Sequence, residues 1–277
     1  MIPYNFQYYQ PTTIKEATNL FQSLLQENKS PIYFAGGTEV ITLGRMNKIV
    51  TDAVIDINNI PACHILEQDD TWLTLGAALT LTSIKEMKKF PLLEKVVSEI
   101  ADRTSRNKIT LGGNICANII YREAVLPFLL TESYAVIATK HGLKERPFHE
   151  LFDQTLQLRE EEFLVQIKVA TKDLTLPFFT VKKRRQWGVG YPLLTIAAIL
   201  KETHIHTAYS GLYAYPFHCE KVDAQLNKPN TEQTKRIERA LQAFHKEILH
   251  DIHGSDTYRK FVLKNVLTDV IDTLKKG

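Results

Sequence analysis

Cysteine is scarce in this chain of 277 residues, which contains only Cys63, Cys116 and Cys219, none of them in a CxxC pair. An iron–sulfur cluster held by cysteines alone needs four thiolates, so we expect no such cluster on this chain. The sequence also lacks any apolar run of roughly 18 residues, the length that spans a membrane. The start, "MIPYNFQYYQ", has neither the basic nor the apolar region of a signal peptide. We therefore expect a cytoplasmic protein with reduced thiols and no membrane partner.

An excess of charge of one sign is missing as well. The 34 basic and 31 acidic residues give a net charge of +3, so we expect no nucleic acid partner. With 44% hydrophobic and 23% charged residues the composition is that of an ordinary globular protein. The length suffices for one large domain or two ordinary domains, each with its own core.

Apolar spacing predicts a mixed α and β organisation. A helix is expected over 14–25 with Thr12 or Thr13 as its cap, and a helical pattern over 83–103 is interrupted at Pro91, which favours a helix start. A hairpin is expected to turn at Asp69 and Asp70. Buried strands are expected at "PIYFA" and "AVIDI", joined by a turn, and further strands at "YAVIATK", "EEFLVQIKVA" and "LPFFTVKKRR".

The organisation changes near Thr171. The segments "PLLTIAAIL" and "HIHTAYSGLYAY" are expected to form antiparallel strands, or a strand with a helix. Two helical patterns follow, "NTEQTKRIERALQAFHKEIL" and "SDTYRKFVLKNVLTDVIDTL". A second, smaller α+β domain is therefore predicted.

Two glycine doublets stand out among only 12 glycines. They lie in "YFAGGTEVITLG" and "ITLGGNICAN". Glycine is required where φ is positive or where a ligand packs on the backbone, because a Cβ would clash in either case. Free amide hydrogens at such turns, with the hydroxyls of Thr38 and Thr110, would suit the two phosphates of a dinucleotide. Two unrelated tight turns are the alternative explanation.

The common nucleotide motifs are absent. The first doublet does not continue as GxGxxG, and GxxxxGK[ST] occurs nowhere, so neither the Rossmann fingerprint nor the Walker A motif applies. If the doublets bind a dinucleotide, a different fold is needed.

The stretches "AGGTEVI" and "TLGGNIC" resemble the FAD-binding medium subunits of molybdenum hydroxylases, of the xanthine dehydrogenase type. The segments "TSRNKITLGGNI", "FFTVKKRR" and "GSDTYRKFVLKNVL" extend the resemblance over nearly the whole chain. It implies an α+β fold with a two-lobed FAD-binding domain of the PCMH type over 1–170. A smaller α+β domain over 171–277, with an antiparallel sheet and helices, would resemble the C-terminal domain of carbon monoxide dehydrogenase flavoproteins.

The resemblance also implies a set of residues for non-covalent FAD. The first turn would contribute Tyr33, Phe34, Ala35, Gly36, Gly37, Thr38, Glu39 and Val40, and the second Thr110, Leu111, Gly112, Gly113 and Asn114. Weaker matches add Ile100, Leu164 and Lys182. The chain departs from the family at "ICANIIYREAVLP", where members often have Ser-Pro and then an aspartate that contacts the cofactor. Glu123 would replace that aspartate.

The function implied by the resemblance is electron transfer. A molybdopterin-binding large subunit and a [2Fe-2S] small subunit would be the partners, NAD the acceptor, and xanthine the most favoured substrate of the complex. Flavin supplies the redox chemistry, so no catalytic acid or base is expected on this chain. The alternatives are a stand-alone flavin oxidoreductase of the same superfamily and a flavin-free scaffold subunit.

A few histidines and one cysteine form a conceivable zinc set. His204 and His206 share a face if "HIHTAY" is a strand, and His218 and Cys219 lie nearby in sequence. No ligand spacing is specific here. We therefore expect solvated histidines and no metal site.

Overall fold

The computed structural model describes residues 2–184 and 190–275. They form two compact units, each assembled from separate stretches of chain. The first unit contains the residues up to Glu86 together with Asp102–Ala117 and Glu132–Thr171, and the second contains Met87–Ala101, Asn118–Thr131 and the residues from Lys172 onward. The domain ranges 1–170 and 171–277 stay a prediction, because compact units need not follow domain order along the chain.

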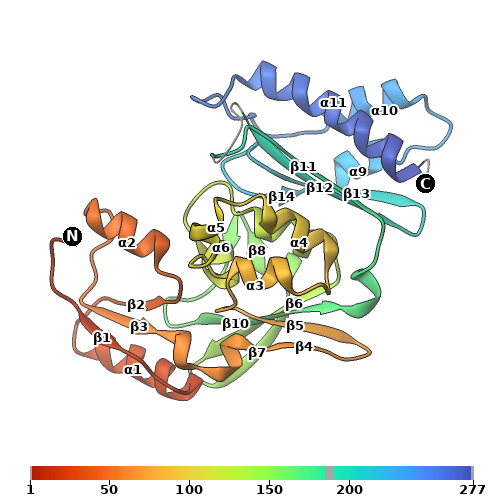
Figure 1. Cartoon of the computed structure of the whole chain (residues 1–277). Coiled ribbons are helices and arrows are strands. Elements are labelled where there is room, and N and C mark those ends of the chain that lie inside the picture. The colour runs from red at the N-terminus through yellow and green to blue at the C-terminus, as the bar shows by residue number, and fades with distance from the viewer. Residues whose placement is uncertain (1, 185–189, 276–277) are drawn as a thin grey trace. The chain divides into compact units, whose positions relative to one another are not determined.

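The first unit opens with a small parallel sheet of strand order β1-β3-β2 (Figure 1). Its elements are β1 (Gln7–Tyr9), α1 (Ile14–Gln26), β2 (Pro31–Phe34), α2 (Thr38–Arg45) and β3 (Ala53–Asp56). The expected cap is confirmed, since the Thr13 side chain accepts from the Glu16 amide. The expected simple turn between β2 and β3 is wrong, because these strands are parallel and need a crossover, which α2 provides.

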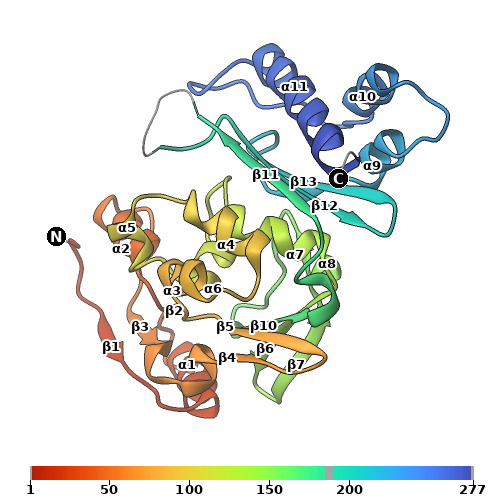
Figure 2. The same cartoon turned by 45° about the vertical axis from the view of Figure 1, so that its right-hand side comes forward.

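The larger sheet of this unit is antiparallel, with strand order β4-β5-β10-β6-β7. Helices α3 and α6 lie over it in both views (Figures 1 and 2). The hairpin predicted at Asp69 and Asp70 is confirmed by β4 and β5. The elements are β4 (Leu66–Gln68), β5 (Trp72–Gly76), α3 (Leu81–Glu86), α5 (Arg103–Arg106), α6 (Leu111–Cys116), β6 (Ser133–Thr139), β7 (Gly142–Pro147) and β10 (Phe163–Ala170).

Short elements connect these strands and helices. They are the 3-10 turns η1 (Ile57–Asn59), η2 (Pro61–His64) and η4 (Thr171–Asp173), the helix α8 (Phe148–Leu151), and the paired strands β8 (Phe152–Asp153) and β9 (Thr155–Leu156).

The second unit is built on an antiparallel sheet of strand order β11-β12-β13-β14, which confirms the strand interpretation of the segments after Thr171. Helices α9, α10 and α11 cover one face of it (Figure 2). Three further elements, α4, η3 and α7, also belong to this unit. The bounds are α4 (Pro91–Ser98), η3 (Glu123–Val125), α7 (Leu126–Leu130), β11 (Phe178–Lys183), β12 (Leu194–Lys201), β13 (His204–Ser210), β14 (Phe217–His218), α9 (Glu220–Leu226), α10 (Gln233–Gln242) and α11 (Asp256–Lys275).

The two faces of this sheet bury different side chains. Leu194, Ile196 and Ala198 alternate along β12 and join the core formed with the C-terminal helices. Thr195 points to the opposite face, where it is paired across the sheet with Lys182 and Ser210. The sheet is therefore buried on both faces, which explains the nearly continuous apolar run of β12.

The length and composition of the described helices bear on whether any of them could span a membrane. None of the described helices is both long and apolar enough to cross a bilayer.

Candidate functional site

The first glycine doublet forms the junction between β2 and α2. Gly37 is the residue before the helix and has φ 69° and ψ −3°, in the left-handed region. A Cβ on Gly37 would also lie 2.2 Å from Cζ of Phe34. Both the backbone conformation and the aromatic neighbour therefore require glycine at this position.

The start of α2 leaves amide hydrogens available. No side chain caps this end, and the first amide bonded to the turn is that of Ile41, which donates to the Gly37 carbonyl at 2.9 Å. Within the part of the chain that the structure describes, the amides of Thr38 and Val40 donate to no protein group. Unpaired amides and the positive end of the helix dipole together favour an anion.

A partly buried polar network holds the first turn from the end of β3. The Asn58 side-chain amide donates to the Ala35 carbonyl at 3.0 Å and to Oδ1 of Asp56 at 2.7 Å. Tyr8 donates its hydroxyl to the other oxygen of Asp56, and this hydrogen bond raises the pKa of Tyr8. Sequence reasoning missed these residues, although "AVIDINN" places polar groups directly after a buried strand.

The second glycine doublet lies in α6, and its amides are already engaged. Thr110 caps the helix: its hydroxyl accepts from the Gly113 amide at 3.1 Å and its carbonyl from the Asn114 amide at 2.9 Å. The amides of Leu111 and Gly112 donate to the carbonyls of Leu79 and Ala77, each at 2.8 Å. The expectation of free amides at both turns is therefore wrong for the second turn, because its amides donate to the capping Thr110 and to backbone carbonyls of a neighbouring segment.

The two turns touch each other. A Cβ on Gly36 would lie 2.0 Å from the carbonyl oxygen of Lys108 and 3.2 Å from the amide nitrogen of Thr110. A Cβ on Gly112 would lie 2.7 Å from that of Ala77. The chain itself therefore occupies the space next to these glycines, and the glycines allow the two motifs to meet in one place.

Of two other predicted residues of this unit, Tyr33 is partly buried and Leu164 is buried. The Tyr33 ring packs between Phe21 and Phe163 at centroid distances of 4.7 and 4.5 Å, and its hydroxyl donates to the Glu161 carbonyl. Burial raises the pKa of Tyr33. Leu164 is 3% exposed and adjoins the β-bulge of β10. Both side chains therefore belong to the core around the turns.

Glu123 and Lys182 form an ion pair of 2.6 Å, and each side chain is only 4% exposed. Lys182 also donates to the Glu99 carbonyl at 3.0 Å. These two residues and the buried Ile100 belong to the second compact unit, whereas both glycine turns belong to the first. The resemblance assigned Glu123 and Lys182 separate contacts with the cofactor, but in the structure their charges are directed at each other.

Several known proteins are similar to this chain. The model of the family described as "FAD binding domain in molybdopterin dehydrogenase" matches residues 4–171. The chain is 22% identical to the nicotinate dehydrogenase FAD-subunit of Eubacterium barkeri, over 99% of this chain and 98% of that protein. It is 27% identical to the carbon monoxide dehydrogenase medium chain of Hydrogenophaga pseudoflava, over 61% and 60%. It is 28% identical to the xanthine dehydrogenase FAD-binding subunit of Escherichia coli O157:H7, over 51% and 49%.

Solved structures share the fold along the whole chain. Carbon monoxide dehydrogenase from Hydrogenophaga pseudoflava matches with a TM-score of 0.88 and 21% identity, covering 100% of this chain and 99% of the other. Quinoline 2-oxidoreductase from Pseudomonas putida 86 matches with a TM-score of 0.86 and 21% identity, covering 99% and 98%. The α+β fold expected from the resemblance, of the PCMH type, is therefore confirmed. Because the family model spans more than half of its residues, the chain belongs to the family of FAD-binding domains in molybdopterin dehydrogenases.

Proposed function

We propose that this protein is the FAD-binding electron-transfer subunit of a cytoplasmic molybdenum hydroxylase. The observation that carries the proposal is the start of α2, where the amides of Thr38 and Val40 are left unpaired directly after the left-handed Gly37. A pyrophosphate can be bound there by backbone groups alone.

The residues present fit such a cofactor. The turn is fixed from behind by Asn58, so the amides are held in place before a ligand arrives. Thr38 is exposed and adds a hydroxyl donor. Gly113 is exposed on the second turn, next to the first, and leaves room for a ligand on its backbone. Flavin, when bound, accepts electrons singly and releases a hydride, which is the chemistry that an electron-transfer subunit needs.

We assign the non-covalent FAD contacts to the first turn, with its backbone as the main phosphate clamp, and to the exposed surface of the second turn. Ile100, Leu164, Glu123 and Lys182 remain proposed contacts from the family resemblance. Each of these side chains is only a few per cent exposed and offers little surface to a ligand. The chain's task is to bind and orient, so no catalytic acid or base is assigned.

The partners and the acceptor are proposed from the family resemblance, and the names of the relatives support an enzyme of several subunits. Several are named as medium chains or FAD subunits of dehydrogenases. We propose that a molybdopterin-binding large subunit oxidises the substrate, a [2Fe-2S] small subunit relays the electrons to the flavin site, and NAD receives them. The cysteines agree with this division of work, because three are too few for an all-cysteine cluster.

The substrate of the complex is proposed to be an aromatic nitrogen heterocycle, with xanthine as the compound favoured by the resemblance. Relatives include proteins named for nicotinate, xanthine, nicotine and caffeine. The relative named for nicotinate matches over almost its entire length, so nicotinate is the second compound to test.

The test compares the isolated chain with the assembled complex. The chain loaded with FAD should reduce artificial acceptors with NADH but should not oxidise xanthine or nicotinate. Co-expression with the molybdopterin and [2Fe-2S] subunits should give NAD reduction that depends on the heterocycle. Turnover of xanthine by the single chain would contradict the subunit function and support a stand-alone oxidoreductase. A chain that assembles normally without flavin would support the scaffold alternative.

A further inference from the structure

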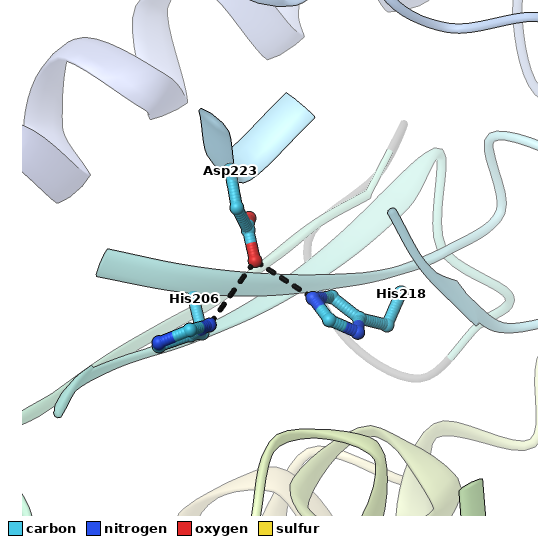
Figure 3. Close-up of side chains that lie close together, drawn as sticks. All are labelled: His206, His218 and Asp223. Atoms are coloured by element: carbon cyan, nitrogen blue, oxygen red, sulfur yellow. Dashed lines mark hydrogen bonds and ion pairs between the residues drawn. The ribbon is translucent and has the colours of Figure 1, made fainter. Parts of the chain in front are cut away.

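Three side chains from three elements of the second unit meet at one edge of its sheet. Figure 3 shows His206 of β13, His218 of β14 and Asp223 of α9 directed toward one another. His206 Nδ1 lies 3.4 Å from Asp223 Oδ2, and His218 Nε2 lies 2.7 Å from the same oxygen. One ligand atom of each residue falls within 4.8 Å of the other two. Two imidazole nitrogens and a carboxylate oxygen therefore converge on one point.

The carboxylate is fixed from behind. Oδ1 of Asp223 accepts from the Thr207 amide at 3.0 Å and from the Thr207 hydroxyl at 2.5 Å. That hydroxyl is 2.7 Å from the hydroxyl of Tyr209, which is fully buried. Only Oδ2 is left to face the two histidines. A ligand oriented by such outer hydrogen bonds is typical of metal sites.

The helix that carries the carboxylate is attached to the edge of the sheet. The Asn227 side chain accepts from the Ile205 amide at 2.8 Å and donates to the Ile205 carbonyl at 2.7 Å. Strand β14 contains only two residues, so β13 has an open edge beside His206. Helix α9 closes this edge and brings Asp223 to it. The placement of the three side chains is therefore set by backbone structure.

Solvent has access to one side of the cluster. The side chains of His206 and His218 are 36% and 25% exposed, whereas that of Asp223 is 7% exposed. Water could therefore complete the coordination. Ligand atoms at about 2.0 Å from a tetrahedral ion are roughly 3.3 Å apart, so a metal ion would have to separate His218 from Asp223 slightly. Rotation of a partly exposed imidazole supplies such a movement.

We propose that His206, His218 and Asp223 bind a divalent transition metal ion, with Zn²⁺ as the most suitable ion. Two imidazoles and one carboxylate are ligands that zinc accepts, and water would occupy the remaining position. This replaces the expectation of no metal site and changes the set considered from the sequence. His204 is outside the cluster, and Cys219 is buried in the core next to the helices. Asp223 completes the set instead.

The rival explanation is that the two histidines only hydrogen-bond and pair with Asp223. The test uses the full chain with its purification tag removed, freed of metal with a chelator, and titrated with ZnCl₂ in a calorimeter. His206→Gln and His218→Gln each remove one ligand while keeping a polar side chain. His204→Gln is the matched control, because it removes a histidine of the same strand that lies outside the cluster.

Wild type and His204→Gln should each bind about one Zn²⁺ per chain with equal affinity. His206→Gln and His218→Gln should each weaken this binding at least about tenfold. Thermal melts in chelator identify any variant whose fold is lost, and His206→Ala or His218→Ala then takes its place. The proposal is overturned if wild type takes up no Zn²⁺, or if folded variants at both cluster histidines bind as tightly as the His204→Gln control.

Discussion

Gly36 and Gly37 are glycines for two different physical reasons. Gly37 adopts a left-handed conformation and lies under the Phe34 ring, so a side chain would be strained and would clash. Gly36 has no positive φ, but the carbonyl of Lys108 lies where its Cβ would be. The first glycine therefore brings the two turns together, and the second starts α2 with the amides of Thr38 and Val40 unpaired.

Replacing Gly36 with alanine should drive the two turns apart. A Cβ placed 2.0 Å from a backbone oxygen cannot be accommodated by a side-chain rotation. We expect Gly36→Ala to lower the free energy of unfolding by about 1–3 kcal/mol. Gly190→Ala is the control, because a Cβ at Gly190 meets no atom within 4 Å, and we expect a change of less than about 0.5 kcal/mol. Urea unfolding curves give both values, and equal midpoints for Gly36→Ala and wild type would refute the close contact.

The Glu123–Lys182 pair makes a second prediction about single residues. Removing Glu123 leaves a buried ammonium group without its charged partner, so Glu123→Ala should cost about 3–5 kcal/mol of unfolding free energy. The exposed pair Lys29–Glu27 is the matched control, and Glu27→Ala should cost less than about 1 kcal/mol.

A double substitution separates the charge effect from loss of packing. Glu123→Leu with Lys182→Met removes both charges together and should be less destabilising than either single replacement. If Glu123→Ala costs no more than Glu27→Ala, the buried pair does not stabilise the fold, and direct cofactor contact becomes the better explanation of Glu123.

At this scale the sequence predicted positions better than contacts. The doublets indicated that something must approach the backbone closely, and this is so at Gly36. A neighbouring carbonyl and a phosphate exclude a Cβ equally well, so the pattern alone does not distinguish them. Likewise, one charged residue in a sequence does not reveal its partner: Glu123 and Lys182 are 59 positions apart and meet only through the fold.

Helix α11 is anchored by one buried arginine. Arg259 is fully buried and donates to the carbonyls of Leu193 and Gly211 and, at 2.6 Å, to the Asp251 carboxylate. Those carbonyls precede β12 and follow β13. The arginine therefore connects the helix to the ends of two central strands.

This anchor should be sensitive to acid. Burial alone would raise the pKa of Asp251, but the His253 amide and the charge of Arg259 outweigh it and hold that pKa below its ordinary value. A depressed pKa stabilises the fold above the unfolded value of about 3.9, and the stabilisation is lost as the pH falls through the folded value. At pH 7, Asp251→Asn should therefore be less stable than wild type by about 1–3 kcal/mol.

The difference in free energy of unfolding between wild type and Asp251→Asn should become smaller as the pH is lowered below about 4. Urea unfolding of both proteins over a series of pH values measures it. If this difference stays constant between neutral and acid pH, the charge of Asp251 does not contribute to the anchor.

Helices with a clear period of hydrophobic residues were predictable from the sequence. Helix ends that depend on contacts with residues distant in sequence were not. The spacing in 14–25 and 255–274 gave α1 and α11 nearly to the residue. The helix expected over 230–249 ends at Gln242. Beyond it, the Lys246 amide donates to the Tyr213 hydroxyl and the Leu249 amide to the Leu212 carbonyl, so bonds to another loop replace the helical bonds.

The whole chain is threaded through two compact units, each with its own core. The resemblance predicted the fold class and the family, because its motifs are short and local. It did not predict that the segments 87–101 and 118–131 leave the first unit to join the second. No local sequence pattern marks the unit to which a segment belongs, because this depends on the sheet against which its side chains pack. Segment 118–131 includes the stretch at Arg122 and Glu123 that departs from the family pattern.

The central claim is that the first glycine turn binds FAD. It is tested most directly by titrating FAD into the flavin-free chain in a calorimeter, with Gly37→Val and Gly190→Ala alongside. Wild type and Gly190→Ala should bind about one FAD per chain, and denaturation should release it intact because no covalent link is expected. Folded Gly37→Val should bind at least about tenfold more weakly, because the new side chain displaces the turn and its amides. Failure of the wild-type chain to bind FAD, or equal binding by Gly37→Val, would contradict the account.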